Sequence, residues 1–381
     1  MTRVLVSAGD ASGEAHAADL VRALAARLPD TRFLGLGGPA LAAAGVEIRV
    51  PLRQVAVGGL VEVLGHVPRV LGAWRSLESA AREAPTDLAV LVDAPDLNLP
   101  LARRLRRAGV PVLYYVAPQV WAWRPGRIAR IARRVDRLAV IFPFEVEVFA
   151  PTGLPVTFVG HPLVDRMAGW RGRHDRRGAR AALGLDRDRP LLLLLPGSRR
   201  NEVRAMLPLH LAAAAALRSR VPGLGIVLAL APTVAPGDVA AALGGLDVTV
   251  VEGRAYEAMA AADVALAKPG TATLELALLG TPFAVAGRAH PLSAAVMRRL
   301  VRLPSWTLPN LLAGAPIVPE FLQEQARPER VAAALAELLD GPARELQRRR
   351  LAAVARRLGP GGAAERAAAI AEEMIRGRLA A

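Results

Sequence analysis

Short apolar runs alternate with helical stripes along the chain. Residues 3–7 form the first apolar run, and residues 9–14, a turn flanked by glycines, follow it. Leu20, Leu24 and Leu28 then recur at four-residue spacing, which is typical of the buried face of an amphipathic helix. A second apolar run follows. Strand, turn, helix and strand at this spacing predict a βαβ unit, and such units build parallel sheets.

The same alternation continues to the end of the chain, with one change near the middle. Residues 170–180 are rich in arginine and glycine and lack apolar periodicity, so they predict a linker. We expect an α/β protein with two Rossmann-like domains, residues 1–168 and 169–343, followed by helices over 344–381. These helices could pack on the N-terminal domain or on a partner chain. Further strands are expected at 88–92, 112–116, 138–142, 156–159, 191–195, 225–230, 248–251, 264–266 and 283–286.

Composition narrows the classes of function. The formal charge is +15, which favours anionic partners such as nucleic acid, anionic lipid or a phosphorylated substrate. Arginine replaces lysine everywhere except at Lys268, so the charge partly reflects a compositional bias. No nucleic-acid motif accompanies it, and aromatic residues are few. Cysteine is absent, which excludes disulfides, cysteine-bound zinc and a cysteine nucleophile and fits a reducing cytoplasm.

Neither end of the chain nor any interior run predicts insertion into a membrane. The N-terminal apolar run is interrupted at Asp10, which is too early for a signal peptide. No stretch approaches the ~20 apolar residues that a span needs. We therefore expect a soluble protein, or one bound to a surface. Residues 58–74 are rich in leucine and valine, and they predict either a core helix broken at Pro68 or an apolar surface near lipid.

A glycine turn between an apolar run and a helix predicts a phosphate site. Residues 264–266 read as a strand, and Gly270 lies in the turn before a helical run. Helix N-termini offer unpaired N–H groups and a partial positive charge, and glycine permits close approach of the anion. Thr271 and Thr273 could add hydroxyl donors, and Glu275 could bind a sugar diol. An ordinary βα turn with a satisfied helix cap has the same pattern.

Charged side chains follow two other predicted strands. Asp93 comes directly after residues 88–92, where open α/β sheets place their ligands, so it is the candidate base. Asp96 could instead be a helix cap. Arg199 follows residues 191–195 at a glycine turn and could pair with a phosphate, or lie on the surface.

Two further patterns bear on chemistry. Four arginines fall at helical spacing and predict a solvated face or a phosphate- or membrane-facing patch: Arg127, Arg130, Arg134 and Arg137. The six histidines are scattered without metal-ligand spacing, so we expect no metal held by a histidine cluster. A G-x-S-x-G nucleophile elbow is absent.

Taken in order, the motifs resemble those of the lipid-A-disaccharide synthase family of GT-B glycosyltransferases. Val-x-Ala-Trp-Arg at 120–124, Leu-Pro-Gly-Ser-Arg at 195–199 and Leu-Pro-Asn-Leu-Leu-Ala-Gly at 308–314 are individually specific. The resemblance covers most of the chain, and its other motifs lie at residues 7–14, 57–65, 92–98, 116–124, 142–145, 160–161 and 270–275. It implies two Rossmann-like domains with a cleft between them.

The resemblance also implies a reaction. These enzymes transfer a diacylated glucosamine from its UDP derivative to the 6-hydroxyl of 2,3-diacylglucosamine 1-phosphate, with inversion and release of UDP. The product is a β-1,6 disaccharide 1-phosphate. They are peripheral proteins on the cytoplasmic face of the inner membrane, so an anionic bilayer surface is an expected partner, and a homodimer is one option. No cofactor is implied, because arginines could supply the charge compensation that a metal gives elsewhere. Another GT-B transferase with a different lipid acceptor is the alternative.

Family positions carry over residue by residue. The catalytic positions are Asp93 as base, with His161 and Asn310 at the cleft. Those for the nucleotide and its phosphates are Arg199, Lys268, Gly270, Thr271, Ala272, Thr273 and Glu275. Those on the acceptor and lipid side are Ser12, Gly13, Glu14, Glu62, Trp121 and Arg124.

The chain departs from the family pattern at three places. The acidic residues of the first motif are exchanged, giving Asp10 and Glu14. Pro269, preceded by Lys268, stands where relatives have serine before the turn glycine. Gly287 stands where relatives often have tyrosine. The last two changes lie at or near the donor loop, so they leave the donor's sugar and acyl chains open.

Overall fold

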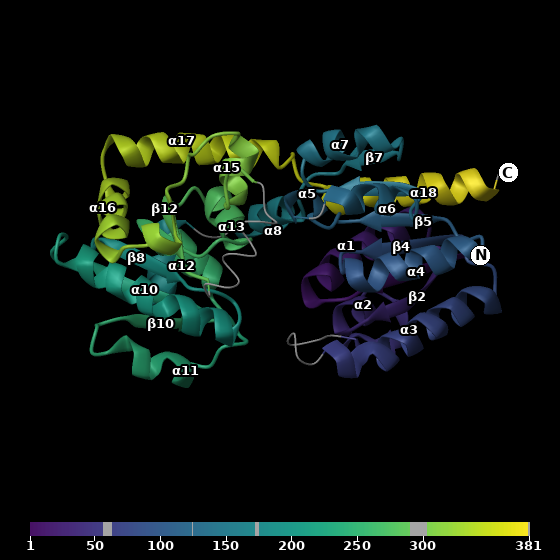
Figure 1. Ribbon diagram of the computed structural model, residues 1–381, viewed down its shortest axis with the longest axis horizontal. Coiled ribbons are helices and arrows are strands. Elements are labelled where there is room, and N and C mark those ends of the chain that lie inside the picture. Colours follow the sequence, from purple (N-terminus) through teal and green to yellow (C-terminus); the bar gives the residue numbers. More distant parts are fainter. Residues whose placement is uncertain (56–62, 124, 172–174, 290–302, 380–381) are drawn as a thin grey trace. The chain divides into compact units, whose positions relative to one another are not determined.

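The structure is a computed structural model that describes residues 1–55, 63–123, 125–171, 175–289 and 303–379 (Figure 1). It divides into two compact units. Unit 1 comprises Met1–Asp165 together with Leu358–Ala381, and unit 2 comprises Arg166–Arg357. We describe each unit by itself.

Unit 1 is built on a seven-stranded parallel sheet in the order β3-β2-β1-β4-β5-β6-β7. The central strands are buried along their whole length, as expected for a parallel sheet covered on both faces. The expected βαβ pattern is therefore present in this half. The strands are β1 (Thr2–Ala8), β2 (Thr31–Gly37), β3 (Val46–Pro51), β4 (Leu88–Val92), β5 (Val112–Tyr115), β6 (Arg137–Val140) and β7 (Val156–Phe158).

Helices cover this sheet, and two of them correct the sequence analysis. Helix α3 continues through Pro68, so the expected break there is wrong. Helix α6 ends at Ala132 and Arg137 begins β6, so the four arginines do not share one helical face. The helices are α1 (Ala11–Arg27), α2 (Pro39–Ala43), α3 (Val63–Glu83), α4 (Pro95–Arg107), α5 (Val120–Trp123), α6 (Ile128–Ala132), α7 (Phe144–Phe149) and α8 (Pro162–Arg171), which crosses into unit 2.

The last helix, α18 (Ala363–Leu379), belongs to unit 1 and packs against α1. Small side chains allow the close contact, because Ala367, Ala368 and Ala371 are fully buried. The Arg27 guanidinium pairs with the Glu372 carboxylate at 2.6 Å. The preceding helix α17 (Pro342–Arg357) belongs to unit 2, so the C-terminal helices are shared between the two units.

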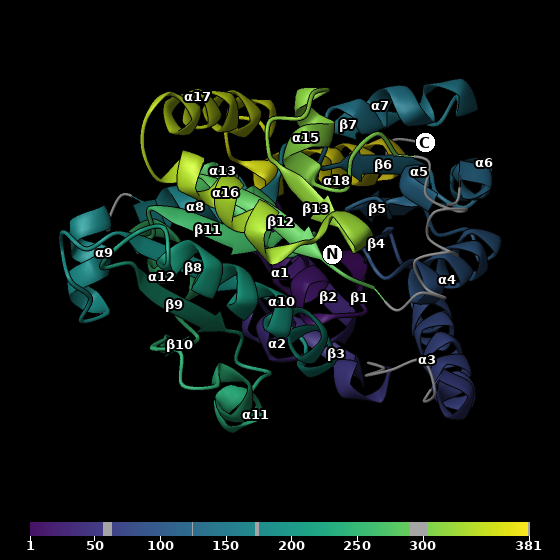
Figure 2. The same ribbon diagram turned by 60° about the vertical axis from the view of Figure 1, so that its left-hand side comes forward.

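Unit 2 has a six-stranded parallel sheet in the order β10-β9-β8-β11-β12-β13. Figure 2 shows α16 in front of β11 and β12, which it contacts. The strands are β8 (Leu191–Leu195), β9 (Gly225–Leu230), β10 (Thr249–Glu252), β11 (Val264–Ala267), β12 (Phe283–Gly287) and β13 (Glu320–Leu322). The other helices are α9 (Arg176–Ala182), α10 (Arg200–Arg218), α11 (Gly237–Ala240), α12 (Ala255–Ala261), α13 (Ala272–Leu279), α15 (Leu308–Ala313) and α16 (Pro328–Leu339).

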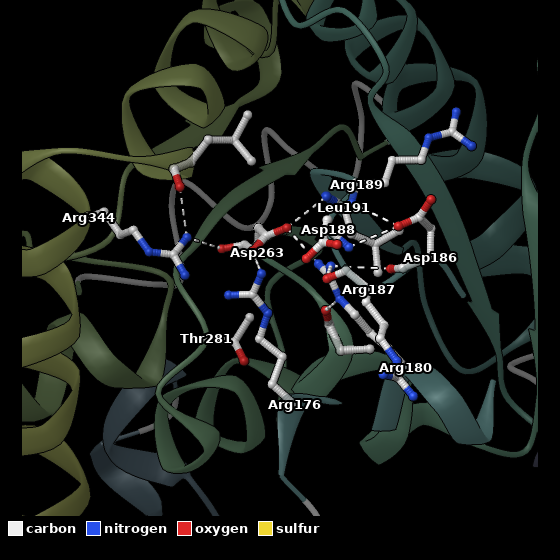
Figure 3. Close-up of polar contacts among 12 residues, drawn as sticks. Arg176, Arg180, Asp186, Arg187, Asp188, Arg189, Leu191, Asp263, Thr281 and Arg344 are labelled. Atoms are coloured by element: carbon white, nitrogen blue, oxygen red, sulfur yellow. Dashed lines mark hydrogen bonds and ion pairs between the residues drawn. The ribbon is translucent and has the colours of Figure 1, made fainter. Parts of the chain in front are cut away.

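A buried arginine anchors the amino ends of the two central strands of unit 2 (Figure 3). The Arg180 side chain is 1% exposed, and its Nη2 lies 2.7 Å from Oδ2 of Asp263. The same Asp263 oxygen accepts a hydrogen bond from the N–H of Leu191, the first residue of β8. Arg180 also donates to the carbonyls of Ala261 and Arg187. The expectation that residues 170–180 are only a linker is therefore wrong, because this segment supplies α9 and a core side chain.

Replacing Arg180 with methionine should lower the free energy of unfolding by about 3 kcal/mol or more, because Asp263 would keep a buried charge with less compensation. Urea-induced unfolding followed by circular dichroism measures the change. The control is Arg22→Met, which removes an exposed ion pair with Asp19 and should have little effect. Equal losses in both variants would contradict a structural role for the buried pair.

Candidate active site

The carboxyl ends of β1 and β4 are joined by a buried asparagine. Asn98, from the second turn of α4, is fully buried. Its Oδ1 accepts a hydrogen bond of 2.8 Å from the Ser7 hydroxyl, and its Nδ2 donates to the carbonyls of Val92 and Asp93, both at 2.9 Å. Nδ2 also approaches the carbonyl of Ser7 at 3.3 Å. Asn98 thus fixes the loop after β4 against β1, a role that sequence reasoning missed.

This anchoring holds Asp93 in an unusual backbone conformation. Asp93 and Ala94 have φ angles of 47° and 45°, a region that residues other than glycine rarely adopt. The Asp93 carbonyl accepts a second hydrogen bond, of 2.6 Å, from the Tyr114 hydroxyl. A Cβ atom at Gly9 would lie 2.4 Å from the Cβ of Ala94, so glycine is needed there. The loop is therefore rigid, and the direction of the Asp93 side chain is set by its neighbours.

The Asp93 carboxyl has the properties of a base that works near neutral pH. Burial, aided by the negative charge of Asp10, raises the pKa of Asp93 to about 6. Asp10 itself caps α1, since its Oδ1 accepts a hydrogen bond from the N–H of Gly13 at 2.7 Å. Asp96 is not a cap: Ala94 occupies the cap position of α4, and Asp96 is an exposed residue 3.4 Å from Arg127. Of Asp93 and Asp96, only Asp93 has its backbone held by hydrogen bonds and its carboxyl partly removed from water.

The residues expected on the acceptor side have different environments. Ser12 is exposed in the first turn of α1. Glu14 is buried, and its Oε1 accepts hydrogen bonds from the N–H groups of Gly38, Ala40 and Leu41 at 2.9, 2.8 and 3.1 Å. This carboxylate caps α2, so the geometry assigns Glu14 to the fold rather than to an acceptor. Glu62 and Arg124 lie outside the described residues.

Trp121 and His161 belong to an aromatic cluster on the same unit. The Trp121 ring meets Phe144 edge-on with ring centroids 4.8 Å apart, and Phe142 lies 5.2 Å from the His161 ring. Trp121 Nε1 donates a hydrogen bond of 3.1 Å to Glu145. Burial raises the pKa of Glu145 to about 7. His161 Nδ1 accepts from the N–H of Leu163 at 3.2 Å, and in the neutral ring the proton therefore sits on Nε2.

In unit 2, an ion pair joins the first turn of α10 to the turn that follows β11. Lys268 Nζ lies 3.5 Å from Oε1 of Glu202, and Oε2 of Glu202 accepts from the N–H of Ser198 at 3.1 Å. A Cβ atom at Gly197 would lie 2.7 Å from the Cβ of Glu202, which explains the glycine in that turn. The Arg199 side chain is 77% exposed, and its guanidinium comes no closer than 3.9 Å to Glu202. Because this contact is weak, the guanidinium can reach a ligand. Glu202 was missed, although the lone lysine is a signal for an acidic partner.

The second turn, after β11, has the backbone geometry on which the predicted phosphate site depends. Gly270 has a φ of 154°, and α13 begins two residues later. Within the described parts of the chain, no hydrogen bond uses the N–H groups of Gly270, Thr271 or Ala272. The Thr273 hydroxyl donates to the Gly270 carbonyl at 2.7 Å, and its expected contact with a phosphate stays a prediction. The N–H groups are available to an anion.

Glu275 lies one turn further along α13 and is held by a tyrosine. The Tyr256 hydroxyl donates a hydrogen bond of 3.1 Å to its Oε1. Burial raises the pKa of Glu275, and the bond from Tyr256 opposes this rise. The Tyr256 ring also contacts Trp170, with centroids 6.4 Å apart. One carboxylate oxygen is thus oriented by α12, which the sequence did not indicate.

Asn310 is committed to the structure of unit 2. Its Oδ1 accepts from the N–H groups of Ile317 and Val318 at 2.8 Å, and its Nδ2 donates to the Val318 carbonyl and to Glu320 at 2.9 Å. The side chain is 3% exposed. A carboxamide has two donors and an acceptor oxygen, and all are engaged here. Every polar atom of Asn310 is thus engaged within unit 2, and the expected catalytic role stays a prediction.

Two absences within the described residues concern metals and membranes. Among them, no three His, Asp or Glu side chains gather in a way that could hold a metal ion. No helix in those same ranges is long and apolar enough to cross a bilayer.

Solved structures with the same architecture identify the fold. CalG4, the calicheamicin glycosyltransferase, superposes with a TM-score of 0.63 at 18% identity, covering 100% of both chains. UDP-GlcNAc 2-epimerase from Neisseria meningitidis, bound to UDP-GlcNAc, has a TM-score of 0.67 at 12% identity, over 98% of this chain and 100% of the other. Similarity at such low identity establishes the fold alone. The chain has the GT-B fold of two parallel-sheet α/β domains, as expected.

The family follows from the sequence comparisons. The pattern of the family described as Lipid-A-disaccharide synthetase matches residues 4–373. Proteins named lipid-A-disaccharide synthase from Geobacter sulfurreducens and Myxococcus xanthus are each 44% identical over 376 residues, covering 98% of this chain and 97% of theirs. The chain therefore belongs to the lipid-A-disaccharide synthase family of glycosyltransferases, which confirms the resemblance seen in its motifs.

Replacing Asp93 with asparagine should stabilise the protein at pH 8 and not at pH 4. The pKa of Asp93 is raised in the folded state, so the wild type loses stability as the pH rises from about 4 to about 6. The shift from 3.8 to about 6 corresponds to at most about 3 kcal/mol. Thermal unfolding of both proteins across this pH range measures the difference. Asp96→Asn is the control, and a similar pH-dependent gain there would contradict the assignment.

Two substitutions at Asn98 should differ in severity. Asn98→Ala leaves the Ser7 hydroxyl and the Val92 carbonyl unpaired, which should cost about 2 kcal/mol or more. Asn98→Asp should cost more, because a carboxylate oxygen would face the carbonyls that Nδ2 now binds. Thermal unfolding ranks the two variants. An aspartate variant as stable as the wild type would show that the hydrogen-bond donors of Asn98 do not hold this loop.

Proposed function

We propose that this chain condenses UDP-2,3-diacylglucosamine with 2,3-diacylglucosamine 1-phosphate to give the β-1,6 disaccharide 1-phosphate and UDP. Family membership supports the formation of the lipid A disaccharide. The observation that carries the specific mechanism is Asp93: its carboxyl has a pKa of about 6, and its backbone is held by Asn98 and Tyr114. Such a group is ionised above pH 6 and can accept a proton there.

The reaction proceeds as an inverting displacement. The Asp93 carboxylate takes the proton from the 6-hydroxyl of the acceptor as that oxygen attacks C1 of the donor sugar. The new C1–O bond forms as the bond between C1 and the diphosphate oxygen breaks on the opposite face, and its electron pair leaves with UDP. One proton is thus transferred to Asp93 and one negative charge to the leaving diphosphate. Rigidity of the base supports this role, because orientation lowers the barrier.

The leaving diphosphate is stabilised by the turns of unit 2. The N–H groups of Gly270, Thr271 and Ala272 point to a phosphate at the start of α13, where the helix dipole favours negative charge. Lys268 and the exposed Arg199 add positive charge from neighbouring turns. Glu275, oriented by Tyr256, accepts hydrogen bonds from the ribose diol. The fold shared with a protein whose structure contains UDP-GlcNAc supports a nucleotide-sugar ligand.

The acceptor is assigned to the carboxyl edge of the sheet in unit 1. Asp93 lies there, with Ser12 and Gly13 in the first turn of α1, which follows β1, and the Trp121 and His161 cluster beyond the ends of neighbouring strands. We place the protein on the cytoplasmic face of the inner membrane as a peripheral enzyme. Its formal charge of +15 would attract an anionic bilayer.

UDP release from purified protein tests the proposal. With both lipid substrates in mixed micelles, Asp93→Ala should lower the rate by about 100-fold or more, the usual contribution of a general base. Asp96→Ala, which removes an exposed carboxylate three residues away, should retain the wild-type rate within about twofold. UDP binding by both variants, measured by calorimetry, shows that unit 2 is intact. Equal rates in the two variants would remove Asp93 from the role of base.

A further inference from the structure

A pocket of about 540 Å³ opens beside the phosphate turn of unit 2. Such a volume is within the range of small-molecule sites. Its walls include the apolar side chains of Met206, Pro269, Trp306 and Leu322, which are all half-buried, and the backbone of Gly287. Neither Glu275 nor Tyr256 lines it. The pocket therefore lies beside the turn, apart from the pair that we assign to the ribose.

Apolar side chains surround the position of Gly287, which has no side chain of its own. A Cβ atom at this position would lie 3.5 Å from Sδ of Met206, 3.5 Å from Cδ of Pro269 and 3.8 Å from Cδ2 of Leu322. Three apolar side chains from separate segments thus converge on one empty position. The φ angle of Gly287 does not require glycine, and these distances are ordinary contacts. The glycine is therefore not imposed by the backbone, and any larger side chain would extend toward these walls.

Charged groups at the border already have partners. Lys268 binds Glu202 and the Pro269 carbonyl. Arg288 donates to the Ala326 carbonyl at 2.6 Å. Glu320 accepts from the N–H groups of Trp306 and Thr307 and from Asn310. The carboxylates and cations at this border are thus engaged, and the surface offered to a ligand by the four side-chain walls is hydrocarbon, sulfur and an indole ring.

We propose that this pocket holds one acyl chain of the donor sugar; the proposal rests on the function proposed above. The diphosphate is assigned to the N–H groups of residues 270–272, and Pro269 is both the neighbour of that turn and a wall of the pocket. A chain attached to the donor sugar can therefore enter directly. Pro269, from the turn after β11, and Gly287, the last residue of β12, meet at this pocket.

A chain-length series tests the pocket. The donors are UDP-glucosamines with two identical acyl chains of graded length, and kcat/KM is measured for the wild type and for Gly287→Leu. Each methylene withdrawn from water contributes up to about fourfold in binding. We expect the wild type to gain with length, and Gly287→Leu to lose about tenfold or more of its preference for long over short chains, because leucine occupies the hydrocarbon volume. The affinity for UDP itself should be unchanged.

A matched control distinguishes the effect of adding a leucine anywhere from the effect of adding it in the pocket. Gly237 lies at the exposed start of α11, has no atom within 4 Å of its Cβ position and does not line the pocket, so Gly237→Leu should keep the wild-type length preference. Met206→Ala enlarges the pocket and should move the preference toward longer chains. A shift in opposite directions for Gly287→Leu and Met206→Ala would identify the pocket as the acyl site.

The possible failures are distinguishable. If the disaccharide forms but Gly287→Leu and Met206→Ala keep the wild-type length preference, the acyl chain lies elsewhere and only this inference falls. If the wild type binds UDP and makes no disaccharide from any donor in the series, the proposed function fails and the acyl assignment falls with it. If Gly287→Leu loses UDP affinity as well, the pocket belongs to the nucleotide and the acyl assignment is wrong.

Discussion

The pairing of Arg180 with Asp263 sets the geometry of the two central strands of unit 2, on which its turns depend. Two charges that are almost fully buried must be mutually satisfied, because an unpaired one would be strongly destabilising. Asp263 precedes β11 and also binds the first N–H of β8, so one carboxylate aligns both strands at their amino ends. The turns at their carboxyl ends are then brought together, and Glu202 can bridge to Lys268. The proposed phosphate site is thus positioned from the opposite edge of the sheet.

Unit 1 uses a neutral group for the same purpose. Asn98 joins β1 to the loop after β4 with hydrogen bonds in place of charges, and it does so directly beneath the candidate base. Its donors hold two consecutive residues in a left-handed conformation that would otherwise be unfavourable. The anchored loop carries a carboxyl that is partly desolvated. Burial and the charge of Asp10 raise the pKa of Asp93, while the hydrogen bonds of Asn98 hold the conformation of its loop.

In the function proposed above, small and apolar residues contribute to specificity alongside charged ones. The proposal gives the charged groups in the turns of unit 2 the part that every UDP-sugar shares, and it gives Pro269 and Gly287 the surface that meets the sugar's substituents. A glycine that the backbone does not require leaves room for a ligand. On this proposal, a change at such a position alters which lipid is accepted and leaves the phosphate site the same.

The sequence by itself determined the βαβ pattern, the parallel sheets, the glycine turn before α13 and the position of Asp93 at a strand end, because these depend on neighbours within a few residues. It also determined the family, through motifs read in order. Tertiary structure alone decided that Arg180 is a core residue, that Glu14 caps α2, that Asn310 has no polar atom to spare and that α17 and α18 belong to different units. Arg180 meets Asp263 across 83 residues, and Glu14 meets Ala40 across 26. Local sequence shows that a side chain is polar, but only the folded chain shows which partner occupies it.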